Sequence, residues 1–407
     1  MRSSVVLLAC VAVFAACGRD GVTRPGTDGG VDAGSSRDAG VDAGVDAGVG
    51  ESDAGESFAA TVLREGDEVL AVAIEPRDEG FLLAWVETDP FAYRITALAL
   101  DERGERTNLD QLVYEVPSAA FYRRAEVLPG GLRRIGANRW RLTALVNDAI
   151  VQLELDQHGF RQGAPRIIPA LDVAWALEDA SGTLLERALS GATARIDTAG
   201  NRSPLPTTQL TGAAVGAATA DGFTLLTTNT TGALALEALA AMAWTTSPVA
   251  QAAASNMVGI DPWAEPLALR PRGGGWVTAW AERSPDNARR VDLRLRGPTG
   301  TTVRVADETA WYSTRAALAL TPSGWALAWT ALGGGYNDRV QFIREGGTAC
   351  ELAAVNGANH DAGPVALALR ADGRLGALWV EPRPLPPADP RRTRLVFQSL
   401  GTRFCAP

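Results

Sequence analysis

After residue 57 the chain alternates short apolar runs with turns that contain glycine, and the second run of each pair ends at or near a tryptophan. Apolar runs of this length, joined by glycine turns, predict antiparallel strand pairs. Four segments show the pattern most clearly: EVLAVAIEPRDEGFLLAWVE (68–87), PLALRPRGGGWVTAWAE (266–282), AALALTPSGWALAWTAL (316–332) and PVALALRADGRLGALWVE (364–381).

The tryptophans of these pairs recur at a fixed spacing. Trp280, Trp329 and Trp379 are 49 and 50 residues apart, and Trp85 precedes Trp280 by 195 residues, which leaves room for three further copies. Weaker copies of the second strand occupy that gap, at Gly136–Val146, Gly182–Ala188 and Gly222–Thr228. A constant period in this range indicates a repeat architecture, here of seven units, with six or eight as alternatives.

Each unit continues with another strand, a turn and a further strand, as in ITALALDERGERT and VQFIREGGTACELA. Four short strands per unit predict an all-β β-propeller with seven four-stranded blades. Because no blade can bury its two apolar faces alone, the blades must stack around a ring, with segment 58–63 completing the last one. The Ala-rich stretch 233–244 is assigned to the outer half of blade four, and the recurrent tryptophans to packing between blades.

The first 16 residues contain one charged residue and then an apolar run too short to span a bilayer, as in a signal peptide. The run ends in Phe14-Ala15-Ala16-Cys17-Gly18, which resembles the lipobox of bacterial lipoproteins except that Phe14 stands where leucine is usual. The resemblance implies that Cys17 carries a lipid at the mature N-terminus. It also implies an exported protein anchored in the bacterial cell envelope, at the outer membrane or the cell surface.

Residues 17–57 include five Asp-Ala-Gly triplets and no aromatic residue. From Gly18 onward the segment has three arginines against nine acidic residues. It lacks the apolar surface needed to fold and predicts a disordered, acidic tether. The expected organisation is therefore a signal peptide at 1–16, a linker at 17–57 and a propeller domain at 58–407.

Composition excludes several classes of chemistry. The net charge is -9 and no run of cations occurs, which argues against a nucleic-acid partner. All 38 basic residues are arginine, so lysine-dependent catalysis is excluded, and two histidines, His158 and His360, cannot form a multi-histidine metal site. Metalloprotease, hydrolase and phosphate-loop motifs are missing, as are the sialidase, WD40 and quinoprotein blade motifs. We therefore expect no metal, no cofactor and no catalytic residue, and a binding protein is favoured over an enzyme.

The binding residues are expected in the longer connections, which this topology collects on one face around the channel. Aromatic side chains mixed with polar ones suit sugar or peptide recognition, although these aromatics could simply pack the loops down. The candidates are Trp263, Trp311, Tyr312, Tyr336, His360 and Asp361.

Cysteines are few. Cys10 leaves with the signal peptide and Cys17 takes the lipid, so Cys350 and Cys405 remain, in the last strands of the last two predicted blades. In an oxidising compartment they would form a disulfide if their Cα atoms lie within about 7 Å; otherwise they are two separate small apolar residues.

These features predict an envelope lipoprotein whose propeller binds or assembles protein or glycan partners. One alternative is a polysaccharide- or peptidoglycan-active enzyme that uses loop carboxylates such as Asp261, Glu308 and Asp361. Another is a structural envelope protein without a ligand.

Overall fold

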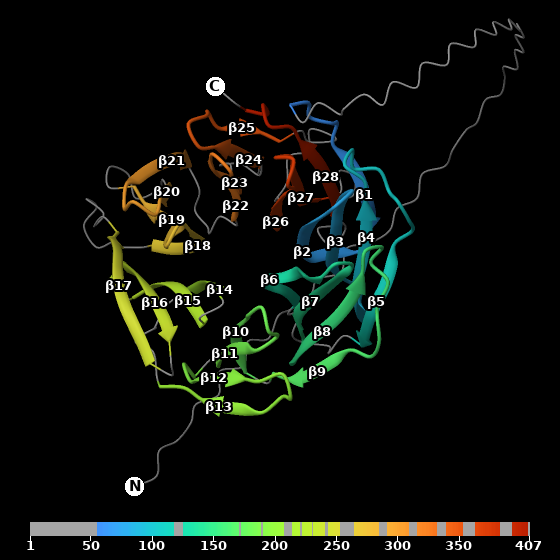
Figure 1. Cartoon of the computed structure of the whole chain (residues 1–407), viewed down its shortest axis with the longest axis horizontal. Helices are drawn as coiled ribbons and strands as arrows, with labels where there is room; N and C mark the ends of the chain where they lie inside the picture. The colour runs from blue at the N-terminus through green and yellow to red at the C-terminus, as the bar shows by residue number, and fades with distance from the viewer. Residues whose placement is uncertain are drawn as a thin grey trace, which may run out of the picture. The chain divides into compact units, whose positions relative to one another are not determined.

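The computed structural model describes fourteen stretches of the chain. They are residues 55–117, 125–170, 172–188, 190–206, 214–219, 222–229, 231–240, 243–252, 264–284, 291–308, 316–331, 339–352, 363–382 and 393–405. Every regular element in these stretches is a strand, and the strands form seven antiparallel sheets of four, arranged around a central channel (Figure 1). The domain is a seven-bladed β-propeller, as the repeat predicts.

Each blade runs outward from the channel in chain order. The innermost strands are β2 (Glu68–Arg77), β6 (Ala125–Gly136), β10 (Val173–Glu178), β14 (Ala214–Thr219), β18 (Ala264–Arg272), β22 (Ala316–Thr321) and β26 (Val365–Leu369). The second strands are β3 (Gly80–Thr88), β7 (Arg139–Val146), β11 (Leu184–Ala188), β15 (Gly222–Thr228), β19 (Gly275–Arg283), β23 (Gly324–Ala331) and β27 (Leu375–Pro382).

The two outer ranks complete the blades. The third strands are β4 (Ala92–Leu100), β8 (Ala149–Asp156), β12 (Thr193–Ile196), β16 (Ala233–Ala240), β20 (Val291–Arg296), β24 (Arg339–Arg344) and β28 (Thr393–Leu400). The outermost are β5 (Gln111–Pro117), β9 (Arg166–Pro169), β13 (Arg202–Pro204), β17 (Ala243–Gln251), β21 (Thr302–Glu308), β25 (Cys350–Glu351) and, in blade seven, β1 (Thr61–Gly66). The Ala-rich stretch at 233–244 is indeed the outer half of blade four.

The ring closes through strand β1. It pairs antiparallel with β28, with Thr61 opposite Phe397 and Gly66 opposite Thr393, so the start of the domain completes the blade that ends it. One residue, Asp67, then joins β1 to β2 of blade one. The predicted closure is confirmed, with the strand three residues further along the chain than expected.

Apolar clusters hold neighbouring blades together, one at each of the seven boundaries. Four recurrent tryptophans lie in these clusters, each packed against the preceding blade and at most 1% exposed: Trp85, Trp280, Trp329 and Trp379. Their predicted role as packing residues between blades is confirmed. Because this packing position recurs once per blade, the tryptophans recur with the period of the repeat.

Glycine opens the second strand of several blades for a steric reason. A Cβ on Gly80 would lie 2.1 Å from the Leu100 carbonyl oxygen, and one on Gly222 would lie 2.4 Å from that of Leu239. Both residues also have a φ of 142°, which side chains disfavour. The backbone at the end of the third strand therefore passes so close to the glycine that no Cβ fits between them. This close approach explains why glycine recurs at the start of the second strand.

Cys350 and Cys405 form a disulfide with their Cα atoms 6.1 Å apart. Cys350 lies in β25 of blade six, but Cys405 lies in a turn five residues beyond β28 rather than in the last strand of blade seven, which is β1. The outer strands of adjacent blades diverge, and the segment after β28 spans the gap between them. The bond thus ties the end of the chain to the neighbouring blade.

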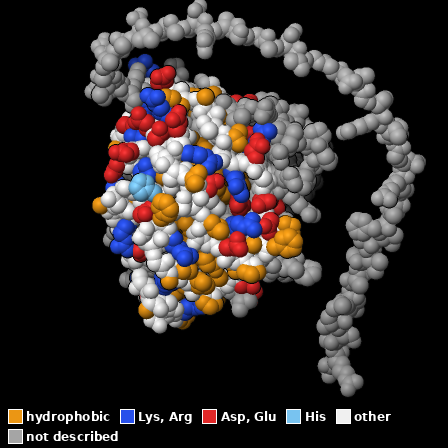
Figure 2. All heavy atoms as spheres, turned by 90° about the vertical axis from the view of Figure 1, so that its right-hand side faces the viewer, with side chains coloured by type: hydrophobic (Ala, Val, Ile, Leu, Met, Phe, Trp, Pro, Cys, Tyr) orange, Lys and Arg blue, Asp and Glu red, His pale blue; other side chains and the backbone are white. Residues whose placement is uncertain are grey.

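The blades present two different ends. At one, here called the turn end, first strands connect to second, as at Asp78–Glu79, and third strands connect to fourth. At the other, here called the loop end, second strands connect to third and each blade connects to the next. Viewed from outside, the wall of blades one and two mixes arginines and carboxylates with hydrophobic side chains (Figure 2). Leu109, Leu112 and Phe160 are exposed hydrophobic residues of these two blades.

Candidate functional site

The binding residues predicted from the sequence lie outside the described residues: Trp263, Trp311, Tyr312, Tyr336, His360 and Asp361. Cys17 is also outside them. The strand ends that flank the predicted loops all lie at the loop end, for example Gln251 and Ala264 on either side of Trp263. Glu308 is the last residue of β21 rather than a loop residue. These assignments therefore stay predictions.

The described residues form a polar pocket elsewhere, at the turn end between blades two and three. Its volume is about 330 Å³, within the usual range for small-molecule sites. Strands β7, β8 and β9 supply one wall and the turns after β10 and β12 supply the other. The lining residues are Arg141, Gln152, Glu154, Gln162, Ala164, Arg166, Ser181, Gly182 and Thr198.

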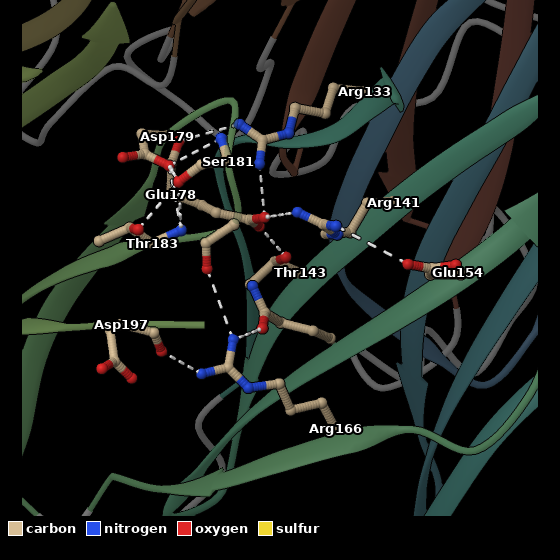
Figure 3. Close-up of polar contacts among 12 residues, drawn as sticks. Arg133, Arg141, Thr143, Glu154, Arg166, Glu178, Asp179, Ser181, Thr183 and Asp197 are labelled. Carbon is tan, nitrogen blue, oxygen red and sulfur yellow. Dashed lines mark hydrogen bonds and ion pairs between the residues drawn. The ribbon is translucent and has the colours of Figure 1, made fainter. Parts of the chain in front are cut away.

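A buried carboxylate organises one side of this pocket (Figure 3). The Glu178 side chain, at the end of β10, has no solvent exposure. It accepts hydrogen bonds from Arg133 Nη2 at 2.5 Å, from Arg141 Nη1 at 3.1 Å and from the Thr143 hydroxyl. Two guanidiniums and one hydroxyl from blade two thus compensate a buried charge from blade three. Burial lowers the pKa of Arg133, and the charge of Glu178 opposes that shift.

The same contacts fix Arg141 at the pocket wall. Held by Glu178, its guanidinium also lies 3.7 Å from Glu154 Oε1. Arg166 approaches from below in Figure 3, where it donates to the Gln152 side-chain oxygen and to the main-chain oxygens of Gly182 and Asp197. Both arginines already have acceptors, so neither is a free anion-binding group.

Gln152 carries the unsatisfied polar atom of the pocket. Its side chain is 6% exposed, its Oε1 accepts the bond from Arg166, and its Nε2 has no hydrogen-bond partner among the described residues. The bond from Arg166 fixes the orientation of the amide, so the unpaired group is a donor. A buried donor without an acceptor costs about 1–3 kcal/mol, which an acceptor atom of a ligand would recover.

The strand register shows how unusual this position is. Gln152 pairs across the sheet with Thr143. The corresponding pairs in five other blades are entirely apolar: Ala84 with Ala97, Leu226 with Leu236, Ala279 with Leu295, Ala328 with Phe342 and Leu378 with Phe397. Both members of the pair are polar in blade two. Aligning the repeat units on their glycine turns would have revealed this exception, whereas a search for motifs does not.

A second pocket of about 510 Å³ occupies the equivalent boundary between blades five and six. It is bounded by the turns of both blades and by side chains that include Trp325, Arg272, Arg304 and Arg344. Its wall is more apolar, and Arg272 and Arg344 donate to the carbonyl oxygens of Gly324 and Gly401. Blade boundaries at the turn end therefore form pockets at two places.

The remaining chemistry is limited. His158 lies in the connection between β8 and β9, where its backbone N–H donates to Asp156 Oδ1 at 2.8 Å. Within the described stretches, no group of three or more His, Cys, Asp or Glu side chains could hold a metal ion. A search of the same stretches for a helix able to span a bilayer finds none.

No protein-family model matches the chain, and no curated protein matches its sequence. The chain is similar to the solved β-propeller domain of Cps50 (Swd1) from Myceliophteria thermophila, with 13% identity over 84% of this chain and 99% of that one and a TM-score of 0.48. Virginiamycin B lyase from Staphylococcus aureus gives 9% identity, 84% and 99% coverage and a TM-score of 0.46. SapL1 lectin in complex with alpha methyl fucoside gives 8%, 72% and 97% coverage and a TM-score of 0.43. At these values the likenesses say nothing about what the chain binds.

Proposed function

We propose that this propeller is an exported binding module that takes a neutral saccharide unit of an envelope glycan in the pocket between blades two and three. The observation that carries the proposal is the buried amide of Gln152, a residue of the pocket wall, whose Nε2 has no hydrogen-bond acceptor among the described residues. A ligand oxygen is the group that this donor lacks.

The rest of the lining favours a neutral, polyhydroxylated ligand. Each hydroxyl of a sugar both donates and accepts hydrogen bonds, as do the amides and hydroxyls of Gln162, Ser181 and Thr198. Glu154 adds an acceptor. An anion is disfavoured because the arginines of the pocket are already engaged by carboxylates, carbonyls and Gln152.

Isothermal titration of the full chain with neutral oligosaccharides and peptidoglycan fragments tests this site. Gln152→Leu removes the free donor and should weaken binding at least tenfold, which is about 1.4 kcal/mol. Gln111→Leu is the matched control, because Gln111 is a partly buried glutamine on the outermost strand β5, away from the pocket, and it should leave affinity unchanged.

Three outcomes would overturn the site. They are binding that survives Gln152→Leu, binding that Gln111→Leu weakens equally, and the absence of binding to every glycan in the panel. Ser181→Ala provides a second variant on the opposite wall and should also weaken binding. Equal thermal unfolding midpoints for the two glutamine variants would show that a loss of affinity is not a loss of fold.

The envelope location is part of the proposal and rests on the lipobox-like sequence before Cys17 and on the disulfide between Cys350 and Cys405, which suits an oxidising compartment. Metabolic labelling with a clickable fatty acid tests it. The wild-type chain should be labelled and sediment with membranes, whereas Cys17→Ala should be unlabelled. Labelling of the Cys17→Ala chain, or an unlabelled wild type, would refute the anchor.

The alternative of a polysaccharide-active enzyme depends on Asp261, Glu308 and Asp361. Their side chains lie outside the described part of the chain, so the structure gives that alternative no supporting geometry. The alternative of a structural protein without a ligand is distinguished by the same titration, since it expects no glycan to bind.

A further inference from the structure

The central channel contains a second, chemically different cavity. It has a volume of about 610 Å³ and is enclosed by the inner strands of six blades, β2, β6, β14, β18, β22 and β26. Polar and apolar surface contribute to its wall in similar amounts, and the apolar residues that line it include Val72, Leu128, Leu267, Leu318 and Leu367. Of the described residues that line it, only Glu75 and Arg270 are charged.

These two residues occupy the same position in their blades. Glu75 lies two residues before the end of β2, in the sequence Glu75-Pro76-Arg77, and Arg270 lies two residues before the end of β18, in Arg270-Pro271-Arg272. Matching strand positions lie at matching depths in the channel. Figure 1 shows β2 and β18 on opposite sides of the channel, and both Glu75 and Arg270 line the cavity.

The two charges are not paired with each other. Within the described part of the chain, neither Glu75 nor Arg270 forms an ion pair. Arg270 Nη1 donates to the Leu269 carbonyl oxygen of its own strand, at 3.1 Å. An acidic residue and a basic residue therefore line the same cavity without an ion pair between them.

The surroundings of Glu75 place its titration near neutrality. Burial raises the pKa of Glu75 to about 7, against the lowering effects of the Arg134 backbone amide, Arg270 and Arg133. Arg133, on the adjacent strand β6, is engaged by Glu178, and the Arg134 side chain by Asp78 at 2.7 Å. Burial also lowers the pKa of Arg270, while Glu75 raises it.

We propose that the channel binds a small zwitterion with an apolar body, of the α-amino-acid class, whose carboxylate contacts Arg270 and whose ammonium contacts Glu75. A ligand with one charge would leave the charge of the other residue buried without a partner, which is costly. The apolar side chain would lie against the leucine and valine wall. This site is independent of the saccharide pocket and shares no residue with it.

Isothermal titration of the full chain with L-leucine at pH 8 tests the channel site. N-acetyl-leucine, which has only the negative charge, and leucinamide serve as the two incomplete ligands. We expect leucine to bind at least tenfold more tightly than either, and Glu75→Gln and Arg270→Gln each to weaken leucine binding at least tenfold. Glu265→Gln, in β18 but outside the channel wall, is the control and should change nothing.

A measurement on the wild type does not depend on any variant folding. Because the ammonium of leucine requires the ionised form of Glu75, leucine affinity should rise as pH increases from 6 to 8, and should be flat in Glu75→Gln. The proposal is overturned if no leucine binding is detected, if N-acetyl-leucine binds as tightly as leucine, or if affinity does not change with pH.

Discussion

At the scale of single residues, several buried polar groups of this propeller form local sets whose members hydrogen-bond to each other. Three tryptophans of the repeat donate their indole N–H to a glutamate two residues later: Trp85 to Glu87, Trp280 to Glu282 and Trp379 to Glu381. Residues two apart in a strand lie on one face, so the Trp-x-Glu spacing itself creates the bond. The glutamate then attracts an arginine.

Blade five shows what such a set contributes to stability. Glu282, 7% exposed, accepts from Trp280 Nε1 at 2.9 Å and from Arg294 Nε at 3.0 Å. Glu282→Ala leaves both donors without that acceptor and should lower the free energy of unfolding by about 2–4 kcal/mol in chemical denaturation. Glu105→Ala, at an exposed turn, should change it by less than about 0.5 kcal/mol. Equal effects of the two substitutions would show that the set adds no stability.

At the scale of strands and blades, arginine side chains link neighbouring blades by hydrogen bonds. Arginine side chains donate to main-chain carbonyl oxygens of an adjacent blade at six boundaries in the described part of the chain. The donors are Arg77, Arg106, Arg133, Arg161, Arg166, Arg202, Arg272, Arg296, Arg344 and Arg370. A planar guanidinium offers five hydrogen-bond donors in a fixed, forked arrangement, and the ammonium group of a lysine cannot reproduce this arrangement. This use is consistent with a sequence whose basic residues are all arginine.

Arg370 provides the test of that role. It is 9% exposed, donates to the Asp78 carbonyl oxygen of blade one at 3.4 Å and lies 3.2 Å from Asp372. Arg370→Lys keeps the charge but loses the fork, and should cost about 1–2 kcal/mol of stability. Arg195→Lys, on an exposed site of β12, should be neutral. If Arg370→Lys also leaves stability unchanged in thermal and denaturant unfolding, the arginine hydrogen bonds between blades do not hold the blades together.

The repeat in the sequence predicted the blades because one physical requirement recurs in each. Trp280 and Trp329 mark the packing between blades, and Gly80 and Gly222 mark the point where backbone passes over backbone. The pocket could not be predicted in the same way. Gln152 is recognised as an exception only when the residue pairs of β8 are compared with those of the other third strands. Glu178 belongs to the next blade, and it lies beside the pocket only because the blades pack around a closed ring.

At the scale of the whole molecule, closure depends on two connections between distant parts of the chain. Strand β1 pairs with β28, and the disulfide links Cys405, after β28, to Cys350 in blade six. The bond closes a segment with a separation of 55 residues. By the loop-entropy relation, Cys405→Ser should destabilise the folded state by about 4 kcal/mol.

Calorimetry of the Cys405→Ser chain checks this expectation, and reduction of the wild type should lower its unfolding temperature by a similar amount. Cys350→Ser should reproduce the effect, and combining it with Cys405→Ser should add nothing further, since a single bond is removed in each case. An unfolding temperature that neither reduction nor substitution changes would mean that pairing of β1 with β28 is sufficient to close the ring.

The central claim is that the boundary between blades two and three is a saccharide site. The most direct measurement is a crystal structure of the full chain soaked with the best-binding glycan of the titration panel. The account predicts a sugar oxygen within hydrogen-bond distance of Gln152 Nε2, between the β8 wall and the turn that carries Ser181. A glycan bound only at the loop end, with this pocket left empty, would contradict it.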